Sequence, residues 1–251
     1  MTPPSTPGDL PGTPPPDHLA ATVPVPAGAV LEAHGVQHAY RRTVALRGVD
    51  LRVDAGEVVA VTGPSGCGKS TLLHAAAGLL VPQAGTVTLL GRDLARLTED
   101  ERALLRRREV GIVLQFGQLV PELTAVDNVA LPLLLDGHPA DGARRLALDW
   151  LERCGAEDVA ATMPSDMSGG EAQRVAVARA LVTGPSVVFA DEPTGSLDTL
   201  AGRQVLGLLV AAVRERGASL VIVTHDNTVA ARSDREVRLV DGTVASEAVL
   251  R

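Results

Sequence analysis

The chain of 251 residues is 45% hydrophobic and 21% charged, which excludes a disordered chain and fits one domain with or without an inserted lobe. Its net charge of −7 argues against nucleic acid as a partner, because the neutralisation of phosphates needs the opposite balance. Its apolar stretches fall short of the roughly 18 residues of a membrane span, and no Lys or Arg precedes Arg41, so we expect a cytoplasmic chain without a secretory signal.

Proline distinguishes the first segment from the rest of the chain. Residues 1–27 hold 9 of the 17 prolines and are predicted to form a disordered tail, because they cannot bury enough apolar surface to offset their ordering entropy. Residues 28–251 are predicted to form the folded domain. Its first part is predicted to contain strands at 30–40, 58–62 and 86–90 and a helix at 69–80.

The middle third of the chain is mostly helical, and the last third returns to alternating strands and helices. This pattern predicts an α/β fold with a mostly parallel sheet covered on both faces, into which a helical lobe of about residues 116–166 is inserted. Asp241 and Gly242 predict a hairpin turn. Helices are predicted at 98–108, 124–135, 141–154, 171–182 and 199–216, and strands at 110–114, 186–190, 219–224, 236–240 and 243–248.

Three other compositional features are interpreted as structural. The one basic cluster, Arg106–Arg108, is interpreted as a solvated helix face, as charge runs usually are. Cys67 and Cys154 do not suggest a disulfide framework, and the six histidines show no pair at ligand spacing. We therefore expect neither a disulfide nor a zinc site.

A glycine-rich loop between a predicted strand and a predicted helix satisfies the pattern G-x-x-x-x-G-K-[ST]. Its glycines let backbone N–H groups converge on an anion, and the helix start adds further donors. Lys69, the only lysine beside 22 arginines, is expected to reach the β- and γ-phosphates, and Ser70 to ligate Mg²⁺. The residues expected to bind the nucleotide here are Gly63, Pro64, Ser65, Gly66, Cys67, Gly68, Lys69, Ser70 and Thr71.

A second motif narrows the chemistry to hydrolysis. The apolar residues 187–190 are expected to form a strand that places Asp191 and Glu192, which follow it in the sequence, beside the phosphate loop. We expect Asp191 to hold Mg²⁺ through water, and Glu192 to polarise the attacking water, a role that typically contributes about 10² to 10⁴ in rate. The pairing of these carboxylates with the loop favours hydrolysis of a nucleoside triphosphate over group transfer.

The stretch SGGEAQRVAVARAL at 168–181 resembles the signature helix of the ATP-binding-cassette (ABC) ATPases. Tyr40, Gln115, Ser196-Leu197-Asp198 and His225 follow in that family's order, and the resemblance covers residues 28–245. It implies a P-loop NTPase with a RecA-like sheet, an antiparallel β subdomain and a helical lobe, using ATP and Mg²⁺. Two departures, Met167 for the usual Leu and Glu171 for the commoner Gln, are not expected to abolish activity.

The resemblance also implies roles for three isolated residues. Tyr40 would stack on adenine, although a core aromatic is the alternative. Gln115 would contact Mg²⁺ and the attacking water, and otherwise it is a polar strand end. His225 would take part in catalysis by contacting the γ-phosphate, and otherwise it is a structural histidine.

By the same resemblance, Ser168, Gly169 and Gly170 would bind the γ-phosphate of ATP held by a second chain. Asp198 would reach that chain's phosphate loop. Two sites would be completed only when two cassettes close face to face. The expected partner is therefore a second copy of the chain or a homologous ATPase.

The stretch at 113–135, together with Glu171, resembles the lipoprotein-release and macrolide-export branch of the family. This implies a separate transmembrane permease docked near Gln115 and the lobe, with the cassette peripheral on the inner face of the membrane. A non-transport regulator of the cell-division type stays open, because the permease determines the substrate. A soluble ABC ATPase of translation or DNA repair is disfavoured, because the chain carries no second cassette, zinc insertion or long coiled coil.

Overall fold

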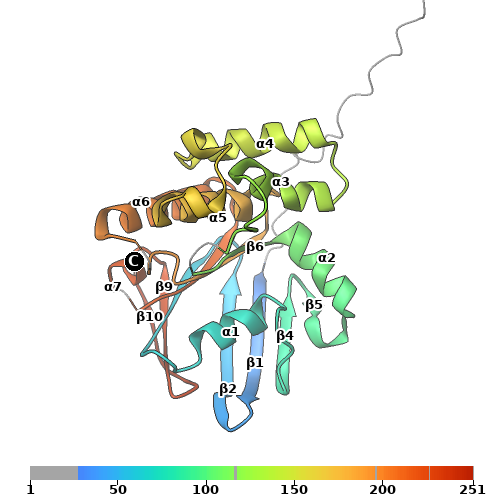
Figure 1. Ribbon diagram of the computed structural model, residues 1–251. Coiled ribbons are helices and arrows are strands. Elements are labelled where there is room, and N and C mark those ends of the chain that lie inside the picture. The colour runs from blue at the N-terminus through green and yellow to red at the C-terminus, as the bar shows by residue number, and fades with distance from the viewer. Residues whose placement is uncertain (1–27, 116–117, 196, 226, 251) are drawn as a thin grey trace, which may run out of the picture.

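The computed structural model describes residues 28–115, 118–195, 197–225 and 227–250. The prediction of a disordered tail concerns residues 1–27, which lie outside this range. The described residues form two sheets and a set of helices (Figure 1). They have the predicted α/β architecture, and the smaller of the two sheets is the antiparallel β subdomain that the resemblance implied.

The smaller sheet is antiparallel and has the strand order β2-β1-β4-β5. Along β2, exposed and buried side chains alternate, so that one face of this sheet contributes to the core. The sheet lies at the bottom of Figure 1, beside α1. Its strands are β1 (Ala29–Tyr40), β2 (Thr43–Asp54), β4 (Ala84–Leu89) and β5 (Arg92–Asp93).

The larger sheet has the order β10-β9-β3-β8-β7-β6, parallel from β9 to β6. Only β9 and β10 are antiparallel, and they form the hairpin that Asp241 and Gly242 predicted. The central strands β3, β7 and β8 are buried along their whole length. The strands are β3 (Val58–Thr62), β6 (Val110–Val113), β7 (Val187–Asp191), β8 (Ser219–Val223), β9 (Arg235–Val240) and β10 (Thr243–Val249).

Helices cover both faces of the larger sheet, and α3 and α4 form an outer layer above α5 and α6 (Figure 1). The helices are α1 (Lys69–Ala76), α2 (Glu99–Glu109), α3 (Ala125–Leu135), α4 (Ala140–Arg153), α5 (Gly169–Leu181), α6 (Thr199–Glu215) and α7 (Asn227–Ala230). Short 3₁₀ turns occur at Leu94–Arg96, Glu157–Val159 and Pro164–Asp166. The first helix ends four residues earlier than predicted, because the N–H groups of Leu79 and Leu80 both turn back to the carbonyl of His74.

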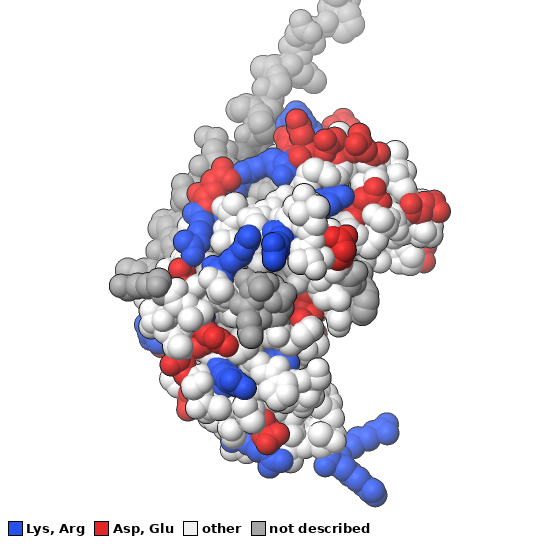
Figure 2. All heavy atoms as spheres, turned by 90° about the vertical axis from the view of Figure 1, so that its left-hand side faces the viewer, with Lys and Arg blue, Asp and Glu red and all other residues white. Residues whose placement is uncertain are grey.

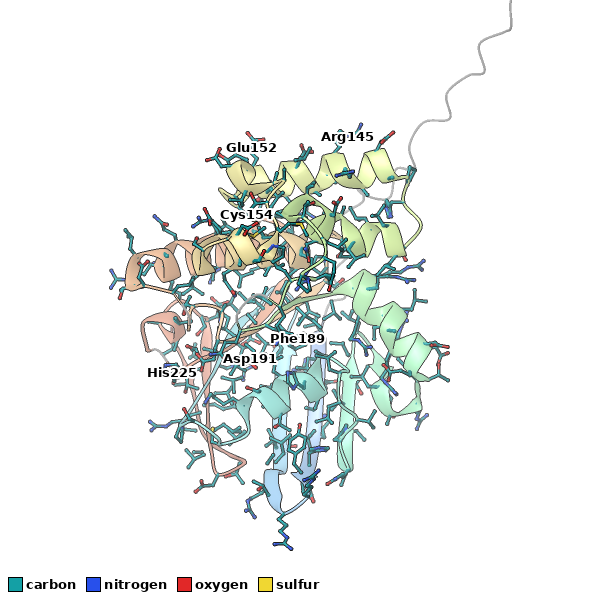
Figure 3. The ribbon with its side chains drawn as sticks, viewed as in Figure 1. Arg145, Glu152, Cys154, Phe189, Asp191 and His225 are labelled. Carbon is teal, nitrogen blue, oxygen red and sulfur yellow. The ribbon has the colours of Figure 1, made fainter. Side chains whose placement is uncertain are left out.

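The side chains of the central strands alternate between two hydrophobic clusters. Val58, Leu220 and Ile222 pack with helices α3 to α6, whereas Val221 and Phe189 pack with α1 and the smaller sheet. A strand that is buried on both faces needs an unbroken apolar run, as these strands have. Phe189 lies at the centre of the molecule in Figure 3, which fits its complete burial.

The cysteines are free and buried, as the absence of a disulfide framework predicted. Cys154 belongs to the cluster on the lobe side of the sheet. Burial raises the pKa of its thiol to about 12, against smaller opposing effects of Arg153 and Arg174. The Cys154 thiol is therefore held in its neutral, unreactive form at neutral pH.

Trp150 joins the end of α4 to the end of α6. Its ring is buried, and the guanidinium carbons of Arg153 and Arg216 lie 4.4 and 4.8 Å from the ring centroid. Arg153 also donates to the carboxylate of Glu215 over 2.5 Å. These contacts fix one end of the outer helical layer to the helix that covers the sheet.

The basic cluster at the end of α2 is only in part the solvated face that the sequence suggested, because the side chain of Arg108 is 54% exposed but those of Arg106 and Arg107 are 18% and 33% exposed. Arg106 donates to the carbonyl of Gly78 over 2.6 Å. Arg107 and Arg108 both pair with Asp136 at the end of α3, at 3.2 and 2.8 Å. The cluster is thus a junction between the helix beside the smaller sheet and the outer helical layer, because a carboxylate 28 residues away in sequence folds onto it.

Among the described residues, no helix combines the length and the apolarity needed to cross a bilayer. Acidic side chains gather along the top edge of the molecule in Figure 2, the end at which Figure 1 shows α3 and α4. An acidic surface of this kind repels nucleic-acid phosphates. This face therefore gives no support to a nucleic-acid partner.

We predict that Asp136→Asn lowers the free energy of unfolding by about 1 kcal/mol at pH 7, because it leaves two arginines without their counter-charge. Burial alone would raise the pKa of Asp136, but the hydrogen bond from Arg108 and the charges of Arg108 and Arg107 hold it below its ordinary value of 3.8. A lowered pKa in the folded state stabilises the protein above pH 3.8, and this contribution disappears as the pH falls through the folded-state pKa. Urea unfolding at several pH values measures the difference.

The matched control is Asp149→Asn, which removes an exposed carboxylate from α4 outside the junction. We expect the Asp136→Asn deficit to be constant from pH 7 to about pH 4 and to shrink below it. An equal effect of both substitutions at pH 7 would show that the junction contributes nothing to stability.

Candidate nucleotide-binding and catalytic site

The glycine-rich loop joins β3 to α1 and lies in a space too narrow for side chains. Gly63 has φ 144°, and a Cβ there would lie 2.0 Å from the carbonyl oxygen of Leu239. Gly68 has φ 104°, and a Cβ there would lie 2.3 Å from the carbonyl oxygen of Ala45. Both positions require glycine, for conformation and for space. The loop is consequently held between β9 and the start of β2.

The turn of the β9–β10 hairpin is hydrogen-bonded to the glycine-rich loop. The N–H of Gly242 donates to the carbonyl of Cys67 over 3.0 Å, and the Gly242 carbonyl accepts from the N–H of Arg47 over 2.8 Å. The sequence identified the hairpin turn but not this contact, because a turn signal carries no information on what packs against it. Beside the loop lies a cavity of about 590 Å³, lined by Thr43, Val44, Arg47, Gly66, Asp241, Gly242 and Thr243.

Lys69 lies inside the loop rather than in solvent. Its side chain is buried, and Nζ donates to the carbonyls of Gly63 and Pro64 over 2.8 and 3.0 Å. Pro64, Ser65 and Gly66 form the exposed tip of the loop. Cys67 and Thr71 are buried beneath it. The only lysine ammonium group of the chain is therefore positioned where the backbone of the loop converges.

Ser70 and Asp191 meet although they are 121 residues apart. The Ser70 hydroxyl donates to Oδ1 of Asp191 over 3.1 Å. Asp191 is the last residue of β7 and is buried, and Ser70 is the second residue of α1. Hydroxyl and carboxylate oxygens are the ligands that Mg²⁺ prefers, so this pair fits the predicted cation site.

Glu192 and His225 form a second polar pair at the same edge of the sheet. Oε1 of Glu192 lies 2.8 Å from Nδ1 of His225, and the Glu192 side chain is 15% exposed. Glu192 has φ 45°, a rare conformation for a residue other than glycine. Hydrogen bonds from its N–H to Val223 and from Gly195 to its carbonyl hold this turn. Figure 3 shows Asp191 and His225 together, far from Arg145 and Glu152 on α4.

Two further predicted residues are placed by their neighbours. A Cβ at Gly195 would lie 3.4 Å from Nε2 of Gln115, so the Gln115 side chain lies beside the turn that begins at Glu192. Tyr40 is 49% exposed at the end of β1, and its ring meets His38 edge-on with centroids 4.7 Å apart. The exposed ring excludes the alternative that Tyr40 is a core aromatic.

The remaining predicted residues lie at the starts of α5 and α6. Ser168 is the N-cap of α5, which begins with Gly169 and Gly170. Asp198 is the N-cap of α6, and its Oδ1 accepts from the N–H groups of the second and third residues of that helix over 2.9 and 3.0 Å. Ser196, part of the sequence resemblance, lies outside the described residues, as do residues 116 and 117. The helix starts carry the positive end of the helix dipole.

The predicted residues thus fall into two groups. The loop with Lys69, the Ser70–Asp191 pair, the Glu192–His225 pair and Gln115 lie at the ends of β3, β6, β7 and β8. The other group is formed by the two helix starts, and Tyr40, at the end of β1, belongs to neither group. The strained backbone at Glu192 is a feature that sequence reasoning missed, and the residue type carries no signal for it.

Comparisons with known proteins identify the family and the fold to which the chain is similar. The family model described as ABC transporter matches residues 46–195. The lipoprotein-releasing system ATP-binding protein LolD of Hyphomonas neptunium is 45% identical over 217 residues, which are 85% of this chain and 95% of that protein. The LolD protein of Ruegeria pomeroyi is 49% identical over 202 residues, 80% of this chain and 89% of the relative.

Two solved structures have a similar fold. The dimeric post-hydrolysis state of the ATP-binding cassette MJ0796 bound to ADP and Pi has a TM-score of 0.84 and 37% identity, and the match covers 88% of this chain and 99% of that one. The cbiO1 protein of Clostridium perfringens, part of the ABC transporter complex cbiONQ, has a TM-score of 0.79 and 29% identity. This match covers 89% of each chain.

We predict that Lys69→Ala weakens ATP binding about 10- to 100-fold, because it removes charge-assisted hydrogen bonds to the phosphates. Isothermal titration calorimetry with ATP measures the affinity, and thermal unfolding checks that the loop still folds. Arg96→Ala is the control, since it removes one positive charge from a side chain that is 86% exposed. ATP affinity close to that of the unaltered chain in Lys69→Ala would contradict the assignment of the loop.

Proposed function

This chain belongs to the ABC transporter family, and on that premise we propose that it hydrolyses ATP to drive a separate membrane permease in export or in the transmission of force across the bilayer. The observation that carries this proposal is the Glu192–His225 pair beside the Ser70–Asp191 pair. Together the two pairs provide a carboxylate that can activate a water molecule and oxygen ligands that can bind a cation, at one edge of the sheet. The relatives named for lipoprotein release support the export branch.

In the proposed mechanism, the chain's own groups first bind and orient the nucleotide. Lys69 exchanges its two backbone partners, the carbonyls of Gly63 and Pro64, for oxygens of the β- and γ-phosphates. Backbone N–H groups of the loop and of the start of α1 bind the other phosphate oxygens. Tyr40 stacks on the adenine with its exposed ring.

The cation and the attacking water are proposed to bind at the carboxyl ends of β6, β7 and β8. Ser70, Asp191 and Gln115 would hold Mg²⁺, which supplies positive charge to the phosphates when bound. Glu192 orients the attacking water and accepts its proton as the water oxygen bonds to the γ-phosphorus. The bond between the γ-phosphorus and the bridging oxygen breaks, which releases ADP and inorganic phosphate. His225 fixes the Glu192 carboxylate through Nδ1 and contacts the γ-phosphate.

We propose that a second cassette completes each site. Ser168, Gly169 and Gly170 present a hydroxyl and helix-start N–H groups, which together bind an anion. In the proposed dimer they bind the γ-phosphate held by the other chain, and Asp198 reaches that chain's phosphate loop. The dimeric state of the similar cassette MJ0796 supports this arrangement.

We propose that the permease contacts the junction of α2 and α3, which positions the cassette at the inner face of the membrane. Exposed apolar side chains flank the ion pairs of Asp136, with Leu104 at 37% and Leu135 at 61% exposure. An apolar surface around a charged junction fits a short amphipathic helix of a membrane partner. Gln115, at the end of β6, is suited to relay this contact to the site.

We predict that Glu192→Gln binds ATP but hydrolyses it about 10² to 10⁴ times more slowly, because the amide does not accept the proton of water. With Mg²⁺ and ATP the Glu192→Gln chain is expected to accumulate as a dimer, because the dimer no longer dissociates through hydrolysis of its ATP. Phosphate release and sedimentation measure the two properties. Glu152→Gln on α4 is the control, and a monomeric Glu192→Gln with normal turnover would refute the assignment.

The transport role is tested by a pull-down from detergent-solubilised native membranes, with tagged Glu192→Gln as bait in the presence of ATP and Mg²⁺. Co-purification of one permease supports the proposal, and an extracytoplasmic domain of that permease that binds cell-wall enzymes would favour the regulatory alternative. Lys69→Ala is the control bait. Recovery of soluble proteins or ribosomes alone would leave the ATPase chemistry intact but refute the transport role.

A further inference from the structure

The start of α5 is closed by a reciprocal pair of side chains. Oε2 of Glu171 accepts hydrogen bonds from both the N–H and the hydroxyl of Ser168, each over 2.7 Å. The N–H of Glu171 in turn donates to the Ser168 hydroxyl oxygen over 3.3 Å. This is a capping box, in which the carboxylate and the serine fix each other's position.

The same serine is the group that the proposed function assigns to the γ-phosphate of the partner's ATP, and the inference rests on that proposal. A serine hydroxyl has one proton to donate. In this structure that proton is committed to Glu171, so donation to a phosphate oxygen requires the bond to Glu171 to break. Binding of the phosphate and closure of the capping box therefore compete.

Charge adds to this competition. The hydrogen bonds from Ser168 hold the pKa of Glu171 below its ordinary value, so the carboxylate is ionised at neutral pH. An incoming γ-phosphate at Ser168 would meet a like charge one hydrogen bond away. Arg174 is the nearby cation that offsets this charge in part, since its guanidinium lies 3.9 Å from the position of a Cβ on Gly170.

We propose that Glu171 is a positioning residue that opposes closure of the two cassettes on ATP, by holding the Ser168 hydroxyl and by placing a negative charge beside the γ-phosphate position. The ATP-bound dimer is consequently weaker than the same dimer with a neutral residue at 171. The dimer with Glu171 therefore dissociates more readily, and its closed, ATP-bound state has a shorter lifetime. Glu171 acts through Ser168 and through charge, without reacting itself.

Glutamine is the informative substitution because it keeps the capping box. Its amide oxygen, in the position of Oε2 of Glu171, accepts from both the N–H and the hydroxyl of Ser168. The helix start is thus preserved and the charge is removed, and the Ser168 hydroxyl is held by a neutral acceptor, from which the phosphate displaces it more easily. Alanine removes the charge but also loses the cap, so it separates the two contributions.

The test measures the dissociation constant of the ATP-dependent dimer by analytical ultracentrifugation, with Mg²⁺ and ATP, in the Glu192→Gln chain. Addition of Glu171→Gln is expected to tighten the dimer about tenfold, with no change in the thermal midpoint. The ratio of the two dimer dissociation constants should decrease as the salt concentration rises from about 0.05 to about 0.5 M, because screening weakens the repulsion between the Glu171 carboxylate and the γ-phosphate. Glu171→Ala is expected to lower the thermal midpoint and to tighten the dimer less.

Equal dimer affinity in the Glu171→Gln chain and its parent, or a tenfold difference that salt does not change, would overturn the inference. Ser168→Ala in the Glu192→Gln chain distinguishes a failure of the inference on Glu171 from a failure of the proposed function. Loss of the dimer in Ser168→Ala, combined with no effect of Glu171→Gln, refutes the role of Glu171 alone. A Ser168→Ala chain that still dimerises with ATP, or a parent that never dimerises, refutes the proposed closure and the inference with it.

Discussion

The site depends on the register of three adjacent parallel strands. Val61 of β3 and Asp191 of β7 both pair with Val223 of β8, so the three strands end at the same edge of the sheet and in the same register. The phosphate loop follows the first, Glu192 follows the second, and His225 follows the third within two residues. A shift of one residue in any pairing would turn the side chains to the opposite face and separate the polar pairs.

Most of the architecture could be predicted from the sequence, because the signals were local. Unbroken apolar runs identified β3, β7 and β8, and capping residues such as Thr98 and Thr124 stand one position before α2 and α3. The loop residues 63–70 were recognisable because the motif specifies both backbone freedom and a charged group. Membership of the ABC transporter family confirms the function class that these signals indicated.

The parts that could not be predicted depend on contacts between distant segments. The arginines at the end of α2 were interpreted as solvated because nothing near them in sequence pairs with them, whereas Asp136 reaches them through the fold of the outer helices. The support that Gly242 gives to Cys67 has the same origin. The positive φ of Glu192 occurs in a turn that is held by a hydrogen bond to Val223 on the neighbouring strand, and the residue type does not indicate it.

The position of Lys69 has a practical consequence for chemical labelling. It is the only lysine of the chain, and its side chain is 7% exposed. Reagents that acylate primary amines therefore find one side-chain target, which coincides with the phosphate loop. The extent of acylation at this residue reports how often the loop opens, and protection from acylation by a nucleotide reports occupancy at single-site resolution without any engineered label.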